Sequence, residues 1–586
     1  MFEFTEEQQA YIESDINRHV FLEACPGSGK TEVVAAKVAT EAKRWRKYPG
    51  GMAVLSFANS ATDELKNRVT KYLPIRRSLF PHFLGTFDSF IYKNIVNPLA
   101  TQLTGFSGQA GDCTIRIIEG TSTLGFRTRW GIARRGNIHA HHYSMDLKNG
   151  GAIFDTGDSI KDRELNAVPL ESWQERDLKE TKNRMLASGY ATYKDIEYLT
   201  LKALTEEKFE KFVQLFAKKY PLIIVDECQD LSFEQLMILQ CLSDVGIKLH
   251  FVGDLHQAIY GFRDVDPEEI SKFVGNNNFF SLELTRNFRS CQNIINLCEK
   301  LTGRRDIIGQ VTWLEPKCFI AQYDSCPTEL ISTFEKLCNG YKNNTIISRG
   351  HSILQKFQTS ASNLNNVQKL ALAIKLFDFD DMDALEKSMT LFSEFIRHHL
   401  QECIKPNSFN CPQSIDSNLA WRRFLCSSLK YFTNNNLKQM TGSWSNWVRS
   451  AKTLVRNLSS QKFIIQEIAQ VISPLNNVNL ASPSGQAGNQ VDAFLGQTTK
   501  TTTLHRKTTI HGAKGETHDV TMLISTARAG GQPGSHWRSW IDSQSSEAAR
   551  FAYVASSRPK HCLIWAVKTL NDADQTRLRD IGFHLL

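Results

Sequence analysis

The octapeptide Ala24-Cys-Pro-Gly-Ser-Gly-Lys30-Thr31 decides the fold class, because it joins the apolar run HVFLEA to the helical pattern EVVAAKVATEAKRW. Glycines in such a loop let backbone N–H groups curl around phosphate oxygens at the positive end of the helix. Lys30 is then placed to reach the β- and γ-phosphates of ATP, and the Thr31 hydroxyl to bind Mg²⁺. The sequence therefore predicts a phosphate-binding loop, whose remaining nucleotide-binding residues are Ala24, Gly27, Ser28 and Gly29.

A second motif, Leu222-Ile-Ile-Val-Asp226-Glu227-Cys-Gln-Asp230, places two adjacent carboxylates at the end of another apolar run. Ligands bind at the carboxyl edge of an open α/β sheet. We expect Asp226 to hold Mg²⁺ through water and Glu227 to act as general base toward the attacking water. Alone, this motif would be read as a strand that ends in acidic turn residues. Together with Lys30 and Thr31 it predicts hydrolysis of ATP.

Seven near-continuous apolar runs predict the strands of the fold. Runs of this kind suit parallel sheets that are covered by helices on both faces. They fall into two groups, at residues 19–24, 52–57, 221–227 and 249–254, and at residues 345–348, 520–524 and 562–567. The sequence therefore predicts an α/β fold with two parallel-sheet cores and mostly α-helical insertion domains.

The predicted boundaries interleave the cores with the insertions. Residues 1–99 and 221–274 make the first core, and residues 275–348 and 505–586 make the second. The insertions are residues 100–220 and residues 349–504. The second insertion has helical periodicity from Leu364 to Leu400, and it leaves through a stretch rich in Asn, Ser, Gly and Thr that we interpret as a loop or hinge.

Composition narrows the class of protein further. The 586 residues carry a net charge of +8, which permits a polyanionic partner without requiring one. We find no apolar run near the ~20 residues of a membrane span, and the acidic start does not resemble a signal peptide. We therefore expect a cytoplasmic protein without membrane contact. Its 13 cysteines form no CxxC pair, which predicts reduced thiols and no structural zinc site. A cluster of three histidines, His139, His141 and His142, could ligate a metal, but a solvated loop is the favoured interpretation.

Further motifs follow in the order found in superfamily 1A helicases, the UvrD/Rep/PcrA group, which the chain resembles over both cores. They are residues 4–8 (FTEEQ), 56–65 (SFANSATDEL), 85–90 (GTFDSF), 252–263 (VGDLHQAIYGFR), 284–290 (LTRNFRS), 511–520 (HGAKGETHDV) and 552–558 (AYVASSR). The resemblance implies two RecA-like cores and an ATP- and Mg²⁺-dependent DNA translocase or helicase with 3′→5′ polarity. It also implies single-stranded DNA and single-strand–duplex junctions as partners.

Phosphoryl transfer is catalysed by positioning and by charge placed on the γ-phosphate. Gln257 follows a strand end and can sense that phosphate or its attacking water. Arg289 and Arg558, from the second core, can act as arginine fingers, so hydrolysis would require the two cores to close. At the base and ribose, the resemblance implies an adenine contact by Gln8, and we expect stacking by Phe288 and a ribose contact by Glu516 or Thr517.

Several residues of the remaining motifs are candidates to bind DNA. Phe57, Phe87 and Phe262 can stack on single-stranded bases, although each is about as well explained as a core residue. The motifs add Asn59, Thr86, Arg263 and His511. A basic and aromatic segment in the first insertion is a further candidate for backbone contact, with a solvated loop equally favoured; it comprises Arg127, Arg129, Trp130, Arg134 and Arg135.

The DNA-side motifs depart from the family pattern. Ser60 stands where the family usually has Lys, Asp88 replaces the usual His, and Asp264 and Val265 replace Gly and Ala. These departures count against strong processive unwinding. The alternative function is a regulatory ATPase subunit that senses nucleic acid and licenses a partner nuclease. Residues 83–99 (FLGTFDSFIYKNIVNPL) and 285–297 (TRNFRSCQNIINL) look most like the compact helicases of bacterial anti-phage systems, especially the Gabija type. That resemblance implies a separately encoded OLD-family nuclease as partner. A P-loop kinase is disfavoured, because Gln229-Asp230 and the two Arg motifs would have no role in one.

Overall fold

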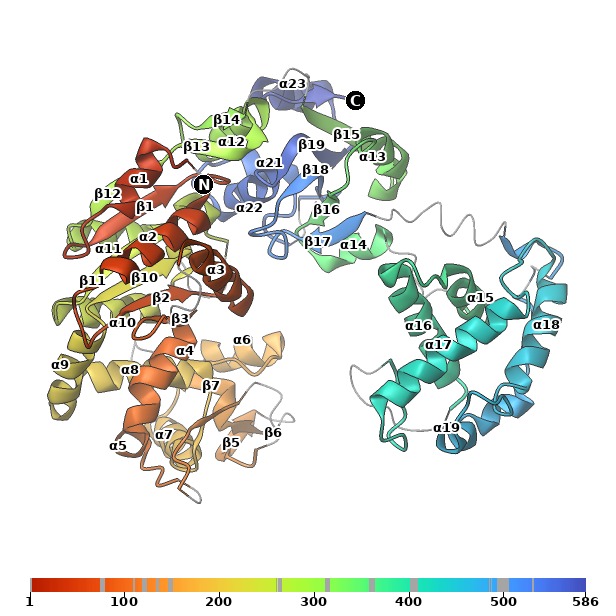
Figure 1. Cartoon of the computed structure of the whole chain (residues 1–586), viewed down its shortest axis with the longest axis horizontal. Coiled ribbons are helices and arrows are strands. Elements are labelled where there is room, and N and C mark those ends of the chain that lie inside the picture. Colours follow the sequence, from red (N-terminus) through yellow and green to blue (C-terminus); the bar gives the residue numbers. More distant parts are fainter. Residues whose placement is uncertain are drawn as a thin grey trace.

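The computed structural model of the chain contains two sheet-based cores and two insertions (Figure 1). The structure describes residues 1–586 except 1–2, 74–78, 109–110, 119–123, 133–135, 146–150, 260, 262–265, 311–316, 358–363, 401–408, 484, 486, 493–504 and 530–531. Within the described residues, no helix combines the length and the apolar character needed to cross a membrane.

The first core is a six-stranded parallel sheet with the strand order β12-β1-β11-β10-β2-β3. Its strands are β1 (Val20–Ala24), β2 (Met52–Ser56), β3 (Phe83–Thr86), β10 (Leu222–Asp226), β11 (Lys248–Gly253) and β12 (Phe280–Leu284). All four strands predicted for this core are present. The short β3 and the half-exposed β12 were not predicted, because neither forms a continuous apolar run.

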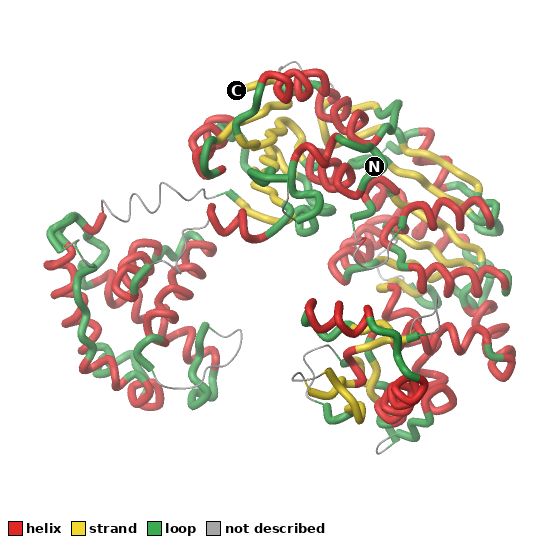
Figure 2. The backbone as a smooth tube through the Cα atoms, turned by 180° about the vertical axis from the view of Figure 1, so that it is seen from behind, coloured by secondary structure: helices red, strands yellow, loops and turns green. Residues whose placement is uncertain are grey.

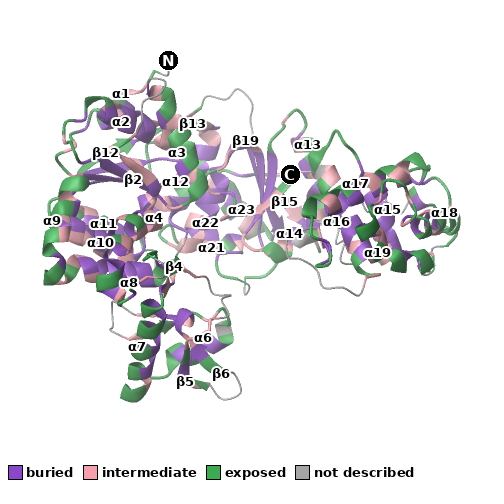
Figure 3. Cartoon of the chain, turned by 60° about the horizontal axis from the view of Figure 1, so that its bottom comes forward, coloured by how far each residue is buried: buried purple, intermediate pink, exposed green. Residues whose placement is uncertain are grey.

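Helices cover both faces of this sheet, as the apolar strands predict. One face packs against α1 (Glu6–Ile12), α2 (Lys30–Arg44) and α3 (Asn59–Tyr72). The other face packs against α4 (Phe87–Ile91), α10 (Phe233–Asp244) and α11 (Pro267–Asn276). Neighbouring strand residues alternate between the two clusters, so the central strands β1, β2, β10 and β11 are buried on both sides (Figure 3).

The second core repeats this topology. Its parallel sheet has the order β17-β16-β18-β19-β15-β20. Its strands are β15 (Cys318–Tyr323), β16 (Asn344–Ser348), β17 (Arg506–Thr509), β18 (His518–Ile524), β19 (Pro559–Lys568) and β20 (His584–Leu585). If the strands of each sheet are numbered in chain order, both sheets read 6-1-5-4-2-3. Position for position, β15 therefore corresponds to β1, and β18 corresponds to β10.

Two layers of helices also cover the second sheet. One face packs against α12 (Gln292–Thr302), α21 (Trp537–Ile541), α22 (Glu547–Ser556) and α23 (Asp572–Ile581). The other packs against α13 (Ile331–Leu337) and α14 (His351–Phe357). Two small strands, β13 (Arg286–Cys291) and β14 (Ile308–Gln310), pair with each other beside this core.

The predicted boundary between the cores at residue 274 is wrong. Strand β12 pairs with β1 from Val20↔Phe280 to Ala24↔Leu284, so the first core continues to Leu284. The chain crosses to the second core at Thr285, which donates its N–H and hydroxyl to the Glu7 carboxylate at 2.9 and 2.6 Å. The crossing therefore lies directly before the Asn287-Phe-Arg289 motif.

The first insertion is more mixed than predicted. Its helices are α5 (Ala100–Thr104), α6 (Ser159–Ala167), α7 (Ser172–Ala187), α8 (Tyr193–Thr205) and α9 (Glu210–Lys219). It also contains three two-stranded sheets made by β4 (Arg116–Ile117), β5 (Arg127–Ile132), β6 (Gly136–His139), β7 (Tyr143–Met145), β8 (Ala152–Phe154) and β9 (Tyr190–Ala191). Residues of α8 and α9 belong to the hydrophobic cluster of the first sheet, so this insertion is continuous with the first core.

The prediction of a solvated loop at the three histidines is wrong. His139 ends β6, and the other two form a single 3₁₀ turn, Ala140–His142, against α7. His141 is only 6% exposed, and burial lowers its pKa to about 4. The three rings contact one another, with centroids 4.3 to 5.2 Å apart.

The second insertion is helical, as its periodicity predicts (Figure 2). Its helices are α15 (Asn366–Leu376), α16 (Met382–Arg397), α17 (Asn418–Asn434), α18 (Trp444–Arg456) and α19 (Gln466–Val471). They bury their own hydrophobic cluster, whose members all lie between Val367 and Val491. This insertion therefore has a core of its own, whereas the first insertion shares the cluster of the first sheet and adds only a small cluster between Ile138 and Leu178.

Candidate active site

The phosphate-binding loop connects β1 to α2 with two left-handed glycines. Gly29 has φ +78° and begins the helix, so Lys30 and Thr31 lie in its first turn. Gly27 has φ +69°, and a side chain there would begin 2.7 Å from Cβ of Arg289. The Phe288 N–H donates to the Gly27 carbonyl at 2.9 Å. Gly27 is therefore required both by the backbone conformation and by the second-core segment packed against it.

The two predicted carboxylates lie at the end of β10, next to Lys30. The Lys30 ammonium pairs with Glu227 at 2.7 Å, and the Glu227 N–H donates to Asp226 at 3.0 Å. Burial raises the pKa of Asp226 above its usual value. Burial alone would also raise the pKa of Glu227, but the positive charges of Lys30 and Lys514 lower it below its usual range. Glu227 is therefore ionised and held by Lys30.

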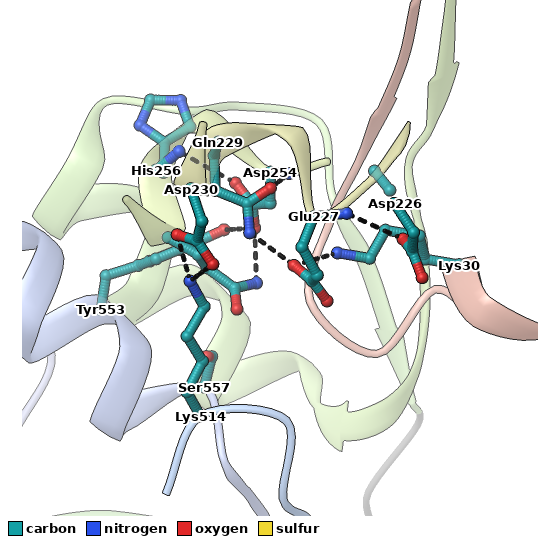
Figure 4. A network of polar contacts seen from close by, with 12 residues as sticks. Lys30, Asp226, Glu227, Gln229, Asp230, Asp254, His256, Lys514, Tyr553 and Ser557 are labelled. Carbon is teal, nitrogen blue, oxygen red and sulfur yellow. Dashed lines mark hydrogen bonds and ion pairs between the residues drawn. The ribbon is translucent and has the colours of Figure 1, made fainter. Parts of the chain in front are cut away.

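A chain of hydrogen bonds runs from Glu227 through Gln229 to Asp254 (Figure 4). It continues from Asp254 to the predicted sensor, Gln257. The Gln229 amide donates to Glu227, and its oxygen accepts from the Asp254 N–H at 3.1 Å. The Asp254 carboxylate accepts from the Gln257 amide at 2.7 Å. Because Asp254 is 1% exposed and Gln257 is 7% exposed, water competes little for these contacts. The ends of β10 and β11 are thereby coupled.

Of the two predicted arginine fingers, Arg558 reaches this network from the second core, and Arg289 packs its Cβ beside Gly27. Arg558 follows α22, is 2% exposed, and donates from Nη2 to the Gln257 oxygen at 3.1 Å. Arg289 lies on β13 and donates to the Ser557 carbonyl at 3.2 Å. Burial lowers the pKa of each guanidinium below its usual value. The second core therefore supplies one buried cation beside Gln257 and one half-buried cation beside Gly27, and negative charge would balance both.

Sequence reasoning missed two contacts that join the cores. The buried Asn287 amide donates to the Pro26 carbonyl, and its oxygen accepts from the N–H groups of Arg289 and Ser290 at 2.7 and 2.8 Å. Lys514 pairs with Asp230 at 2.6 Å across the two cores. Burial raises the pKa of Asp230, which Lys514 partly offsets, to about 6. Asn287 and Lys514 both lie within helicase-like motifs, so their motif membership was the available signal.

The predicted adenine and ribose residues differ in their availability. The Gln8 amide donates to the Ser28 carbonyl at 3.0 Å, and its oxygen accepts from the Thr5 N–H at 3.0 Å. In this structure the Gln8 side chain is therefore hydrogen-bonded to the phosphate-binding loop. Phe288 is 45% exposed and presents a ring for stacking. Glu516 pairs with Arg506 and contacts His518 at 3.1 Å.

The residues predicted for Mg²⁺ supply the right kind of ligand. Thr31 in the first turn of α2 offers a hydroxyl, and Asp226 at the end of β10 offers a carboxylate. Mg²⁺ prefers oxygen ligands and takes several of them from water and substrate phosphates. In the part of the chain that the structure describes, no group of three or more His, Cys, Asp or Glu side chains could hold a metal ion. The Thr31 and Asp226 set fits Mg²⁺ held together with nucleotide.

The predicted DNA-binding residues do not form one exposed track. Phe87 is 2% exposed in the cluster of the first sheet, so the prediction that it stacks on DNA is wrong for this arrangement. Thr86 caps α4 by accepting from the Ser89 N–H at 3.2 Å. Asn59 is exposed at the start of α3, and Phe57 is partly buried. Phe262 and Arg263 lie outside the described residues.

His511 joins the two cores in this structure. One ring nitrogen, Nδ1, lies 3.1 Å from the Arg349 guanidinium, and Nε2 lies 3.0 Å from the Ile259 carbonyl. Both ring nitrogens are therefore engaged by protein groups. In the basic segment of the first insertion, Arg127 and Arg129 are exposed, whereas Arg134 and Arg135 lie outside the described residues.

Residues 4–278 match the family of UvrD/REP helicase N-terminal domains. Among curated relatives, DNA helicase II of Haemophilus influenzae is 23% identical over 323 residues, which cover 53% of this chain and 42% of the relative. A probable DNA helicase of Mycoplasma pneumoniae is 21% identical over 375 residues, 62% of this chain and 65% of the relative. Gabija protein GajB of Bacillus cereus is 25% identical over 281 residues, 47% of this chain and 45% of the relative. The chain thus spans less than two thirds of each of these relatives.

Proposed function

We propose that this chain, which carries a UvrD/REP helicase N-terminal domain and is related to superfamily 1A helicases, is an ATP- and Mg²⁺-dependent DNA translocase or helicase. It would move 3′→5′ on single-stranded DNA and act at single-strand–duplex junctions in the cytoplasm. The names of the relatives and the ordered motifs support this proposal.

One observation carries the proposal most directly, namely the hydrogen bond from Arg558 of the second core to Gln257 of the first. Arg558 is buried beside Gln257, and we expect its cation to stabilise charge that develops on the γ-phosphate. Such a contact exists only while the cores are together. It therefore supports a cycle in which nucleotide binding favours closure of the two cores and hydrolysis allows them to reopen. The contacts of the cores with one DNA strand would then alternate between the closed and open states.

The catalytic roles follow from the residues at the loop. When nucleotide is bound, Lys30 would contact its phosphates in place of Glu227. The Glu227 carboxylate would then be free to accept a proton from the attacking water. Gln257 would orient that water while Arg289 and Arg558 stabilise the transferred phosphoryl group. Thr31 and Asp226 would hold Mg²⁺, which supplies further charge neutralisation when it is bound.

The test is ATP hydrolysis by the full chain with and without single-stranded DNA. We expect hydrolysis to be stimulated by DNA and to be lost in Lys30→Ala, with weaker nucleotide binding. The exposed Lys43 on the same helix supplies the matched control, and Lys43→Ala should hydrolyse ATP normally. Undiminished DNA-stimulated hydrolysis by Lys30→Ala would show that the site is assigned wrongly.

A second candidate is a regulatory ATPase subunit that licenses a nuclease of the OLD family, within an anti-phage system. The similarity to Gabija protein GajB favours it, as do Phe87 and His511, which contact protein where the family contacts DNA. Strand displacement on duplexes with 3′ or 5′ tails separates the two candidates and reports polarity. Robust unwinding by the chain alone counts against a pure switch, whereas ATP hydrolysis without unwinding counts against a helicase.

A further inference from the structure

We propose that Arg304 is a positioning residue for ATP hydrolysis, which holds Asp254 and, through it, the Gln257 amide in the orientation that meets Arg558. This inference rests on the proposed ATPase function. Arg304 lies outside every motif of the sequence, and it contacts the Ala24 carbonyl and Asp254, whereas Arg558 contacts Gln257 directly.

The chain delivers Arg304 to the phosphate-binding loop by a reversal at the end of α12. Gly303 ends that helix with φ +75°, a left-handed conformation that favours glycine. Four residues later, the Ile307 N–H donates to the Glu299 carboxylate at 2.8 Å. The Ile307 side chain packs with Cys25 and Ile295 in a small buried cluster. The segment that follows α12 is therefore held to α12 by Glu299 and packed against the phosphate-binding loop through Ile307.

The Arg304 guanidinium contacts two parts of the first core. Its Nη1 donates to the Ala24 carbonyl at 3.3 Å and lies 3.5 Å from the Asp254 carboxylate. The side chains of Arg304 and Asp254 are 10% and 1% exposed. Burial opposes the charge on Arg304, but Asp254 raises its pKa above the usual value. The pair is therefore a largely desolvated ion pair whose loss would leave a buried carboxylate without its cation.

The carboxylate of Asp254 decides which way the Gln257 amide points. An ionised carboxylate only accepts hydrogen bonds, so it takes the amide NH₂ of Gln257, at 2.7 Å. The amide oxygen is then directed to Arg558, at 3.1 Å. The Tyr553 hydroxyl also donates to Asp254, at 3.3 Å. Arg304 holds the Asp254 carboxylate in place, and thereby fixes the Gln257 amide with its NH₂ group toward Asp254 and its oxygen toward Arg558.

The experiment compares Arg304→Gln with Arg305→Gln, the same change at the adjacent, exposed arginine. We expect Arg304→Gln to lower DNA-stimulated kcat by at least about tenfold while the directly measured Kd for ATP changes less than about threefold. Arg305→Gln should match the wild type within about twofold. In the Gln257→Ala background, adding Arg304→Gln should cost less than about twofold, because both changes disable the same amide.

Each outcome supports or overturns the positioning role of Arg304. Additive losses in the double variant, or an Arg304→Gln variant as active as Arg305→Gln, would overturn the role of Arg304. If Arg304→Gln does not fold, Arg304→Lys keeps the charge and should retain ATP affinity with reduced kcat; equal losses of affinity and kcat would show a purely structural role. A wild-type chain without DNA-stimulated hydrolysis would instead refute the proposed function.

Discussion

The two sheets share the strand order 6-1-5-4-2-3, yet only one carries the residues of phosphate chemistry. After β1 the loop reads Pro26-Gly-Ser-Gly-Lys30, whereas after the corresponding β15 it reads Asp324-Ser-Cys-Pro-Thr. Strand β10 ends in Asp226-Glu227, whereas β18 is followed by Ser525-Thr526. Topology alone therefore does not make a nucleotide site. The glycines, the lysine and the carboxylates on that topology do.

The second core contributes cations instead. Arg558 and Lys514 contact side chains of the first core, and Arg289 packs its Cβ beside Gly27, all from elements that do not correspond to the phosphate-binding loop. In the proposed mechanism, the first core binds the nucleotide and the second stabilises the charge that develops in the transition state. Substitutions in each core, with binding and turnover measured separately, distinguish these two contributions.

A large effect is expected for Glu227→Gln, which removes the base and keeps the shape of the first core. General bases contribute about 10²–10⁴-fold to rate, so DNA-stimulated turnover should fall within that range. Nucleotide and DNA should still bind, because Lys30 and the loop remain. Single-turnover hydrolysis and equilibrium binding measure the two quantities. Glu283→Gln, at an exposed glutamate on β12, is the control, and a Glu227→Gln variant with normal turnover would remove Glu227 from the mechanism.

A smaller effect is expected for Lys514→Ala, which breaks the ion pair between the cores. The variant leaves Asp230 buried without its cation, so closure should weaken and turnover should fall by about tenfold or more. Adding Asp230→Asn should recover part of the loss. The control is Lys560→Ala, since Lys560 pairs with Asp519 inside the second core at 3.5 Å. Equal losses in Lys514→Ala and Lys560→Ala would contradict a role in closure.

The smallest effect is a pH dependence from His511. Burial lowers the pKa of His511 below 6.5 in the closed arrangement; Arg349 and Lys514 lower it further, whereas the Ile259 carbonyl and Glu547 raise it. Below about pH 6.5 an open form takes up a proton that the closed form resists, so closure weakens as pH falls. Turnover should drop several-fold from pH 8 to pH 6, and His511→Gln should flatten that profile. If the wild type and His511→Gln have identical pH profiles of turnover, protonation of His511 does not affect closure of the cores.

The nucleotide site could be predicted from sequence because its chemistry is local. Lys30 and Thr31 follow their glycines directly, and Asp226 and Glu227 end a recognisable strand. The resemblance then identified Arg289 and Arg558, which no spacing rule would place beside Gln257. The repeated sheet order was not predicted, because β3, β12, β17 and β20 are too short or too polar to be distinguished from loops, and because the apolar run of β15 was missed.

Other residues were misjudged for physical reasons. Phe87 fits a stacking ring and a core residue equally well in sequence, and its burial depends on α8 and β2 from distant segments. The boundary at residue 274 failed because β12 has exposed residues on one face. Arg304 was missed because its contact with Asp254 depends on the reversal at Gly303 and on the meeting of two cores.

The most direct test of the division between the cores is Arg558→Ala, with turnover and ATP affinity measured separately on the same protein. An arginine supplied across an interface is worth about 10³–10⁵ in rate in other P-loop enzymes. We predict that DNA-stimulated turnover falls by at least about a hundredfold while the Kd for ATP changes only several-fold, because Lys30 and its loop still bind the phosphates. Normal turnover by Arg558→Ala would show that the second core does not complete the site, and the coupled two-core mechanism would be contradicted.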